Sequence, residues 1–184
     1  KLCMDVLGNF FLAEFEDEYD LSNYHEQLYS YRAAEVVLDT VSHSVPSKVL
    51  SAGLEALYNA TVYPPTLERL VVKDLVETIL KIIQIHDYDE VVIQHAMSMV
   101  HAITVSATCR TILLEDGGFQ VIVGVIENSF LEKERIEVLE NTVSAFYHLS
   151  TDEEIRKRMV ALGGIAAVAN LIGLSEGDGY EREC

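Results

Sequence analysis

The sequence predicts an all-α fold in which about four helical repeats stack into one elongated array. Three segments of the 184-residue chain align with one another: 51–61, 94–104 and 140–150. Each segment keeps an apolar pair three residues apart and ends in a hydroxyl residue. The matching apolar residues Leu54, Met97 and Val143 stand 43 and 46 positions apart. A helical period of about 40–47 residues is typical of solenoids that bind other chains on a long surface.

Glycine pairs mark the same period a second time. Gly117-Gly118 and Gly163-Gly164 are 46 positions apart, and Lys73-Asp74 lies 44 positions before the first pair. Because glycine reaches positive φ without steric cost, each glycine pair predicts a sharp reversal between two helices. We expect these glycines to form the repeat turns.

Apolar residues at helical spacing place the elements in order. The expected helices are 2–13, 21–30, 32–43, 47–61, 66–72, 73–85, 90–104, 106–115, 119–128, 132–150, 151–162 and 165–173. The helix over 73–85 is apolar nearly all round, so we expect it to be buried between layers. Ser47 is expected to cap its helix, and Thr151 is expected to cap another that has acids in its first turn.

The domain organisation follows from this pattern. One continuous array is expected over 1–174, with units at about 1–20 (partial), 21–61, 62–104, 105–150 and 151–174 (partial). The acidic stretch 14–20 is expected to be a linking loop, because like charges repel and extend a chain. Residues 175–184 are expected to be a mobile tail or linker. The chain does not begin with Met and its first residues read as mid-helix, so we expect a piece of a longer protein.

The charge balance restricts the class of partner. Thirty acidic residues oppose thirteen basic ones, which gives a net charge of −17. Phosphate binding needs clustered Lys and Arg, so no nucleic-acid partner and no membrane partner is expected. A basic peptide or protein would be steered toward such a surface, whereas a second interpretation is that the charge only keeps an apolar array soluble. No apolar run approaches the ~18–20 residues that a membrane span needs.

The cysteines indicate the compartment. Cys3, Cys109 and Cys184 are odd in number and lack the spacing of a metal or redox motif, which fits a reducing environment. We therefore expect a cytoplasmic protein, with a nuclear, cytoskeletal or ciliary location left open. No metal site and no cofactor are expected.

Residues 108–119 and 152–165 together resemble the armadillo-repeat family. The shared pattern is a short polar helix, an apolar residue, an acidic or alanine residue, Gly-Gly and an aliphatic helix. The family's long third helix is matched well by 140–150 and 51–61 and loosely by 94–104. The resemblance implies an all-α, right-handed α-solenoid of about four armadillo-like three-helix repeats. Because the glycine pair is missing from the first two units, a HEAT-like architecture is the alternative there.

In that family, the third helices line a concave groove in which an asparagine ladder holds a partner's backbone. The corresponding residues here are Asn9, Asn59, Ala102 and His148. An Asn amide offers one peptide unit both a donor and an acceptor. The tryptophans of the family's nuclear-import adaptors are replaced by Asp5, Glu55, Ser98 and Ser144, so capture of a basic import signal is not expected.

The resemblance therefore implies a binding set on the concave face. Its members are Asn9, Glu55, Tyr58, Asn59, His101, Ser144, Tyr147 and His148. For Tyr58, His101 and Tyr147, which flank the ladder, the alternative role is to cover the packing between repeats.

No catalytic constellation has convincing spacing. His95 and His101 are six residues apart and fall on largely different faces of a helix, which does not suit a zinc pair. Ser144 and His148 are four apart, but no nucleophile elbow or third member accompanies them. We therefore predict a non-enzymatic scaffold or adaptor that binds a partner segment on the concave face, within a larger complex. The alternative is a static component of a large cytoskeletal or ciliary (axonemal) assembly.

Overall fold

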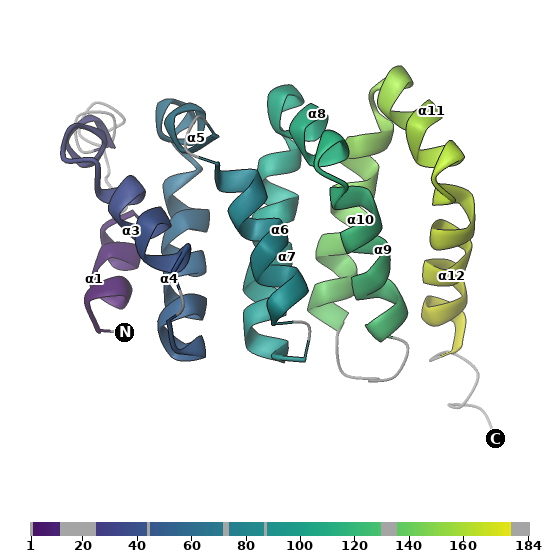
Figure 1. Cartoon of the computed structure of the whole chain (residues 1–184), viewed down its shortest axis with the longest axis horizontal. Coiled ribbons are helices and arrows are strands. Elements are labelled where there is room, and N and C mark those ends of the chain that lie inside the picture. The colour runs from purple at the N-terminus through teal and green to yellow at the C-terminus, as the bar shows by residue number, and fades with distance from the viewer. Residues whose placement is uncertain are drawn as a thin grey trace.

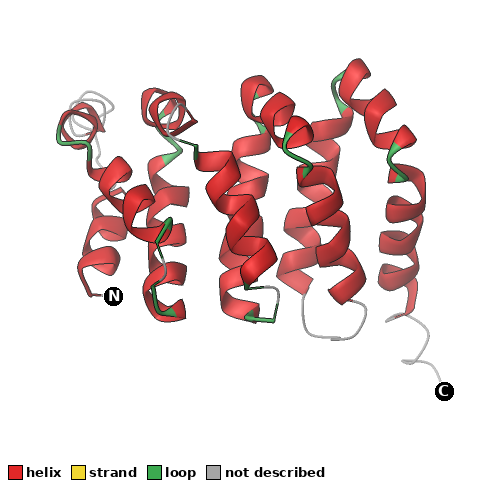
Figure 2. Cartoon of the chain, in the orientation of Figure 1, coloured by secondary structure: helices red, strands yellow, loops and turns green. Residues whose placement is uncertain are grey.

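The structure is a computed structural model that describes residues 2–11, 25–43, 45–71, 74–86, 88–129 and 136–177. Figures 1 and 2 show that this part of the chain is built from helices joined by short turns, with no strand among the described residues. The helices are α1 (Leu2–Phe11), α3 (Ala33–Val41), α4 (Ser47–Ala60), α5 (Pro64–Val71), α6 (Leu75–Ile85), α7 (Glu90–Thr104), α8 (Ala107–Glu115), α9 (Gly118–Ser129), α10 (Ile136–Ser150), α11 (Glu153–Ala161) and α12 (Gly164–Gly177). Residues 25–30 are also helical. The predicted all-α class is confirmed.

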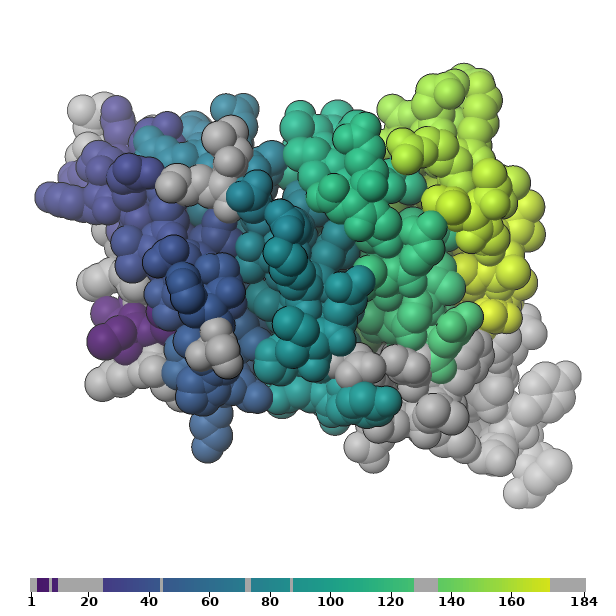
Figure 3. Space-filling view, viewed as in Figure 1, coloured from purple at the N-terminus to yellow at the C-terminus, as the bar shows by residue number. Residues whose placement is uncertain are grey.

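The helices are arranged in chain order along the long axis of the molecule, and sequence neighbours stay together from one end to the other (Figure 3). The helices fall into successive groups along the chain, and α1, α4, α7 and α10 are the last helices of four of them. These last helices pack side by side, α1 on α4, α4 on α7 and α7 on α10. We call these four helices the third-helix row. The helices that precede them, α3, α6 and α9, lie against the row, and α6, α9 and α12 also contact one another in order.

The observed helices differ from the expected ones by a few residues at their ends. The last helix runs to Gly177, so residues 175–177 are helical rather than part of a mobile tail. Helix α5 begins at Pro64, two residues earlier than expected, because proline has no N–H to lose at the first position of a helix. The predictions for 14–20 and 178–184 lie outside the described residues.

Helix α6 is buried as its sequence predicts. Six of its apolar side chains are at most 5 % exposed: Leu75, Val76, Ile79, Leu80, Ile82 and Ile83. It lies between α7, α8 and α9, which explains why apolar residues occur nearly all round it.

The same tight reversal joins helix 25–30 to α3, α5 to α6, α8 to α9 and α11 to α12. Its key residue has positive φ in all four cases, at Arg32 (56°), Asp74 (64°), Gly117 (75°) and Gly163 (91°). Two of these turns therefore keep the geometry without glycine. Aspartate tolerates this region better than most residues, and Arg32 donates from Nε to Glu35 Oε1 at 3.1 Å. The glycine pair identified two of the turns in the sequence, Lys73-Asp74 marked the third, and nothing marked Arg32.

The second glycine of each pair is needed for space. A Cβ on Gly118 would lie 2.6 Å from the Leu113 carbonyl oxygen, and one on Gly164 would lie 2.8 Å from the Met159 carbonyl oxygen. The helix that follows the turn therefore starts in direct contact with the backbone of the helix before it.

We expect Gly118→Ala to lower the free energy of unfolding by about 1–3 kcal/mol, because backbone atoms of α8 would have to shift. Gly124→Ala in the same helix is the control. Among the described residues, no atom other than those of the neighbouring residues and nearby backbone of α9 lies within 4 Å of its added Cβ, so helix propensity should raise stability by about 0.5–1 kcal/mol. Urea unfolding followed by circular dichroism measures both, and equal signs for the two variants would refute the steric explanation.

The hydroxyl residues that end the three aligned segments have a common role. Thr61, Thr104 and Ser150 each donate to the carbonyl oxygen three residues earlier, at 2.7, 2.7 and 2.8 Å. An arginine of the following helix satisfies further carbonyls, since Arg110 donates to Thr104 at 2.8 Å and Arg156 donates to Ser150 at 2.7 Å. These bonds satisfy carbonyls at the ends of α7 and α10 that have no partner within the helix.

The predictions that Ser47 and Thr151 cap their helices are both wrong. Ser47 is the first helical residue of α4 and is preceded by Pro46, which provides no side-chain cap. At α11 the cap is Asp152, whose Oδ1 accepts from the N–H groups of Glu154 and Ile155. The Thr151 hydroxyl instead donates to the His148 carbonyl oxygen at 2.6 Å, because the end of α10 lies directly beside it.

Candidate functional site

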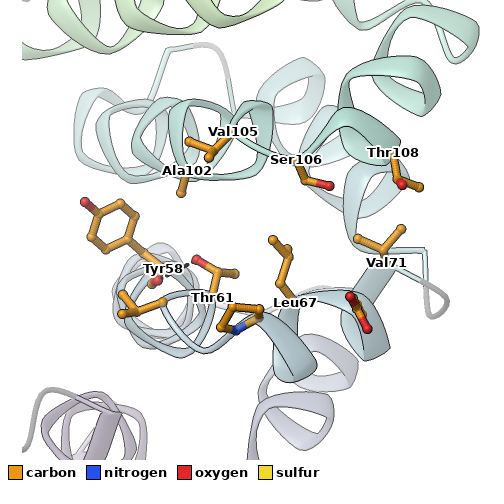
Figure 4. Close-up of a pocket in the computed structure, with 11 residues that line it drawn as sticks. Tyr58, Thr61, Leu67, Val71, Ala102, Val105, Ser106 and Thr108 are labelled. Carbon is orange, nitrogen blue, oxygen red and sulfur yellow. Dashed lines mark hydrogen bonds between the residues drawn. The ribbon is translucent and has the colours of Figure 1, made fainter. Parts of the chain in front are cut away.

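A cavity of about 700 Å³ opens between α4 and α7, where α5 and α8 begin. Apolar side chains form most of its wall: Tyr58, Val62, Leu67, Val71, Ala102 and Val105. Figure 4 shows Tyr58 and Leu67 on one side of the opening and Ala102 and Val105 on the other. Glu68, Ser106 and Thr108 add polar groups to the lining. An apolar cleft with a few polar groups is suited to holding a side chain of another molecule.

The cavity exists because Ala102 is small. In the next seam of the row, the position that matches Ala102 is His148, and its ring stacks on His101 with centroids 5.6 Å apart. In the α4–α7 seam the position that matches His101 is Tyr58, and the residue across the cavity from it is Ala102, whose side chain is a methyl group. The α7–α10 seam is therefore filled by two rings, whereas the α4–α7 seam stays open.

Asn59, a predicted ladder residue, lies on α4 one turn after Ala56 and is 5 % exposed. Helices α1 and α4 come close together at Ala56, because a Cβ on Gly8 would lie only 3.6 Å from the Cβ of Ala56. Among the described residues, Nδ2 of Asn59 has no hydrogen-bond partner. An amide buried to this extent is not presented to an incoming chain, so Asn59→Ala is a poor test of groove binding.

Polar side chains bridge the α7–α10 seam along its length. Nδ2 of Asn141 donates to Ser98 Oγ at 2.9 Å, and Gln94 Nε2 donates to the Glu137 carboxylate. Between α4 and α7 the corresponding contact is weaker, with His95 Nε2 3.9 Å from the largely exposed Glu55 carboxylate. The cleft of the row therefore opens at the α4–α7 seam, where the polar contact between the helices is the weaker one.

The remaining residues of the predicted set are spread along the row. Tyr147 is 67 % exposed and lies edge-on to His148, with ring centroids 5.5 Å apart. Ser144 is half-buried and Asn9 is exposed on α1. Tyr58 alone among the eight lines the cavity. The sequence analysis did not identify α5, whose Leu67 and Val71 line the cavity. The one sequence signal for the cavity was Ala102, where an alanine stands in place of the ladder asparagine.

The stacked histidines carry the clearest electrostatic effect in the row. Partial burial, and then the neighbouring charges of His101 and Arg110, lower the pKa of His148 below the ordinary value of 6.5. The neutral form of His148 is thus the form that the folded protein favours.

This shift predicts a dependence of stability on pH. Because the folded pKa of His148 lies below the unfolded value, its contribution is complete above pH 6.5 and is lost as the pH falls through the folded pKa. We expect the His148 Hε1 resonance to titrate below pH 6.5 in the wild type, and nearer to that value in His101→Gln. NMR titration measures both midpoints, and an unchanged midpoint in the variant would refute the proposed coupling between the rings.

No group of three or more metal-ligating side chains occurs within the part of the chain that the structure describes. Burial raises the pKa of the Cys109 thiol, which disfavours the reactive thiolate, and Cys3 is exposed. None of the described helices is long and apolar enough to span a membrane.

Comparisons of the chain with models of known protein families, with curated proteins and with solved structures gave no match.

Proposed function

We propose that this protein is a non-enzymatic interaction module, a right-handed α-solenoid of about four armadillo-like repeats that binds a partner segment on its concave face. The repeated turn at Arg32, Asp74, Gly117 and Gly163 supports the repeat assignment. The repeated carbonyl bonds at the ends of α4, α7 and α10 support it independently. In this proposal the third-helix row lines the concave face.

The observation that carries the proposed function is the open cleft between α4 and α7. Its apolar walls suit an aliphatic or aromatic side chain of the partner, which would insert between Tyr58 and Ala102. Exposed carboxylates lie near by, with Glu68 in the lining and Glu55 one turn before Asn59 on α4. Together with the net charge of −17, they favour a segment in which Lys or Arg flanks the apolar residue.

The test uses a defined probe, a phage-displayed library of random dodecapeptides selected against the immobilised protein. We expect the selected peptides to share an apolar residue next to Lys or Arg, and to bind more weakly as salt is raised. Labelled versions of these peptides give dissociation constants by fluorescence anisotropy.

We expect Ala102→His to weaken binding of these peptides at least about tenfold, or ~1.4 kcal/mol. The introduced imidazole should cover Tyr58 in the way that His148 covers His101, which fills the cleft without opening the core. Ala161→His, the same change at an exposed position of α11, is the matched control and should leave the affinity unchanged. Equal binding by Ala102→His and the wild type would place the peptide elsewhere.

A second candidate is a static component of a large cytoskeletal or ciliary assembly. It is favoured by the apolar side chains that the last helix exposes: Ile165, Val168 and Ile172. A protein of this kind would make its contacts through its edges and convex face and not through the cleft. Failure to select any peptide, with helicity intact, would support this candidate.

A further inference from the structure

The two ends of the cavity between α4 and α7 differ in chemistry. Figure 4 shows the Tyr58 ring and Ala102 at one end, and Ser106, Thr108 and Val71 toward the other. The first end is bounded by an aromatic ring and a methyl group, whereas hydroxyl groups line the second. A ligand that fills the cavity therefore needs an apolar group at one end and a polar group at the other.

Glu68 belongs to the hydroxyl end of the cavity. It lies three residues before Val71 on α5, and residues at this spacing share one face of a helix. Its side chain is exposed, and no cation among the described residues forms an ion pair with it. The first turn of α8 brings the positive end of a helix dipole to this end of the cavity, but that is only about half a charge. The hydroxyl end therefore favours a cation.

The oxygen atoms at this end suit an ammonium group. Ser106 Oγ accepts from the Cys109 N–H at 3.5 Å, which leaves its second lone pair available. Thr108 is exposed in the first turn of α8. Together with the Glu68 carboxylate, the two hydroxyls provide three acceptor groups for the three N–H donors of a lysine. Arginine would bring five donors in a rigid planar fork, which these three groups match less well.

The cavity has room for two side chains of one segment. Its volume of about 700 Å³ lies in the range of pockets that enclose a whole drug-sized ligand. Leu67 and Val71, which both line it, are four residues apart and therefore about 6 Å apart along α5. Alternate residues of an extended chain point to the same side and are about 6.6 Å apart. Two residues separated by one other thus fit the two ends.

We propose that the partner segment places an apolar residue between Tyr58 and Ala102 and, two positions away, a lysine whose ammonium pairs with Glu68. This inference rests on the proposed function, and it specifies for the same cleft which basic residue is recognised and at what spacing. Glu68 is then the residue that determines specificity. Because the two ends of the cleft differ, the segment binds in one direction, with the lysine always on the same side of the apolar residue.

Fluorescence anisotropy with a peptide from the phage selection tests the spacing and the lysine. We expect replacement of its lysine by norleucine, or a shift of the lysine to the position next to the apolar residue, to weaken binding about fivefold, the upper end for an exposed ion pair. Replacement by arginine should weaken it about twofold, because the planar fork fits these acceptors less well. Across the selected peptides, lysine should recur two positions from the apolar residue and on one side of it.

Glu68→Gln identifies the group that recognises the lysine. We expect this variant to bind the lysine peptide about fivefold more weakly than the wild type does, and to bind the norleucine peptide as the wild type does. Glu115→Gln is the matched control, since it removes one exposed carboxylate at the other end of α8, outside the cavity lining. It should keep the preference for lysine. Both variants should keep the circular dichroism spectrum of the wild type.

The proposal is wrong if Glu68→Gln weakens both peptides equally, the result expected if its carboxylate acts only through the net charge or on the first turn of α8. It is also wrong if the wild type does not prefer lysine to norleucine, or if lysine occurs equally on both sides of the apolar residue. Ala102→His separates this failure from that of the proposed function. If Ala102→His weakens every peptide while Glu68→Gln shows no preference, the cleft binds the segment without recognising a lysine. If Ala102→His binds like the wild type, or no peptide is selected, both proposals fail.

Discussion

Phe119→Ala is expected to lower the free energy of unfolding by about 3–5 kcal/mol, the largest loss foreseen for a single change in this protein. Phe119 is fully buried, and its ring lies 5.4 Å from that of Phe146 across the contact between α9 and α10. Removal of the ring leaves a cavity that the surrounding helices cannot fill without moving apart. Urea unfolding followed by circular dichroism measures the loss.

Tyr88→Ala is the matched control for Phe119→Ala. Its side chain is 91 % exposed, so removal should change the free energy of unfolding by less than about 0.5 kcal/mol. In a stack of helices the loss at Phe119 should be felt most by its neighbours, so hydrogen exchange in α9 and α10 should accelerate more than in α4. A cost below about 1 kcal/mol would mean that these helices do not depend on the pair of rings.

Arg69→Leu is expected to lower the free energy of unfolding by about 3 kcal/mol, because it leaves a buried carboxylate with a weaker partner. Glu35 is 8 % exposed and lies 3.2 Å from Arg69 Nη1. The same Nη1 donates to the Tyr29 carbonyl oxygen at 2.7 Å, and the guanidinium lies 3.3 Å above the Tyr29 ring. After the change, Glu35 keeps only the pair with Arg32, whose side chain is 58 % exposed.

The double variant Glu35→Leu/Arg69→Leu separates the cost of the stranded charge from the value of the pair. Replacing both members of a buried ion pair with apolar residues is often close to neutral, so the double variant should recover much of the stability that Arg69→Leu loses. Urea midpoints of the wild type, both single variants and the double variant complete the cycle. A double variant that is less stable than Arg69→Leu would show that the pair itself, and not the unpaired carboxylate, holds α3 against α5.

The repeat turns show how far local sequence signals reach. Gly117 and Gly163 identify two turns directly, because glycine is the residue that favours positive φ. Arg32 adopts the same conformation with nothing in its immediate sequence to indicate it. The Arg32 side chain donates from Nε to Glu35 of α3 at 3.1 Å, and Glu35 in turn pairs with Arg69 of α5, so contacts outside the local sequence accompany this turn. A local signal is therefore sufficient to recognise this turn and is not necessary for it.

The predicted binding set shows the same limit more clearly. The positions of Asn59, Ala102 and His148 follow from a repeat alignment, and the structure buries Asn59 and places the other two at seams of the third-helix row. What each one does there depends on the residue that it meets across the seam. Asn59 is buried on α4, Ala102 leaves a cleft beside Tyr58, and His148 stacks on His101.

The sequence by itself determined that the chain is helical, where most helices begin and end, and which helix is buried between layers. Those properties depend on apolar residues three or four positions apart, on turn residues and on caps, all of which are local. Only the tertiary structure decided that a cleft opens between α4 and α7 and that Asn59 is buried. These features depend on the distance between side chains about 40 or more residues apart, which is set by the summed volumes of both partners at a seam and not by either segment alone.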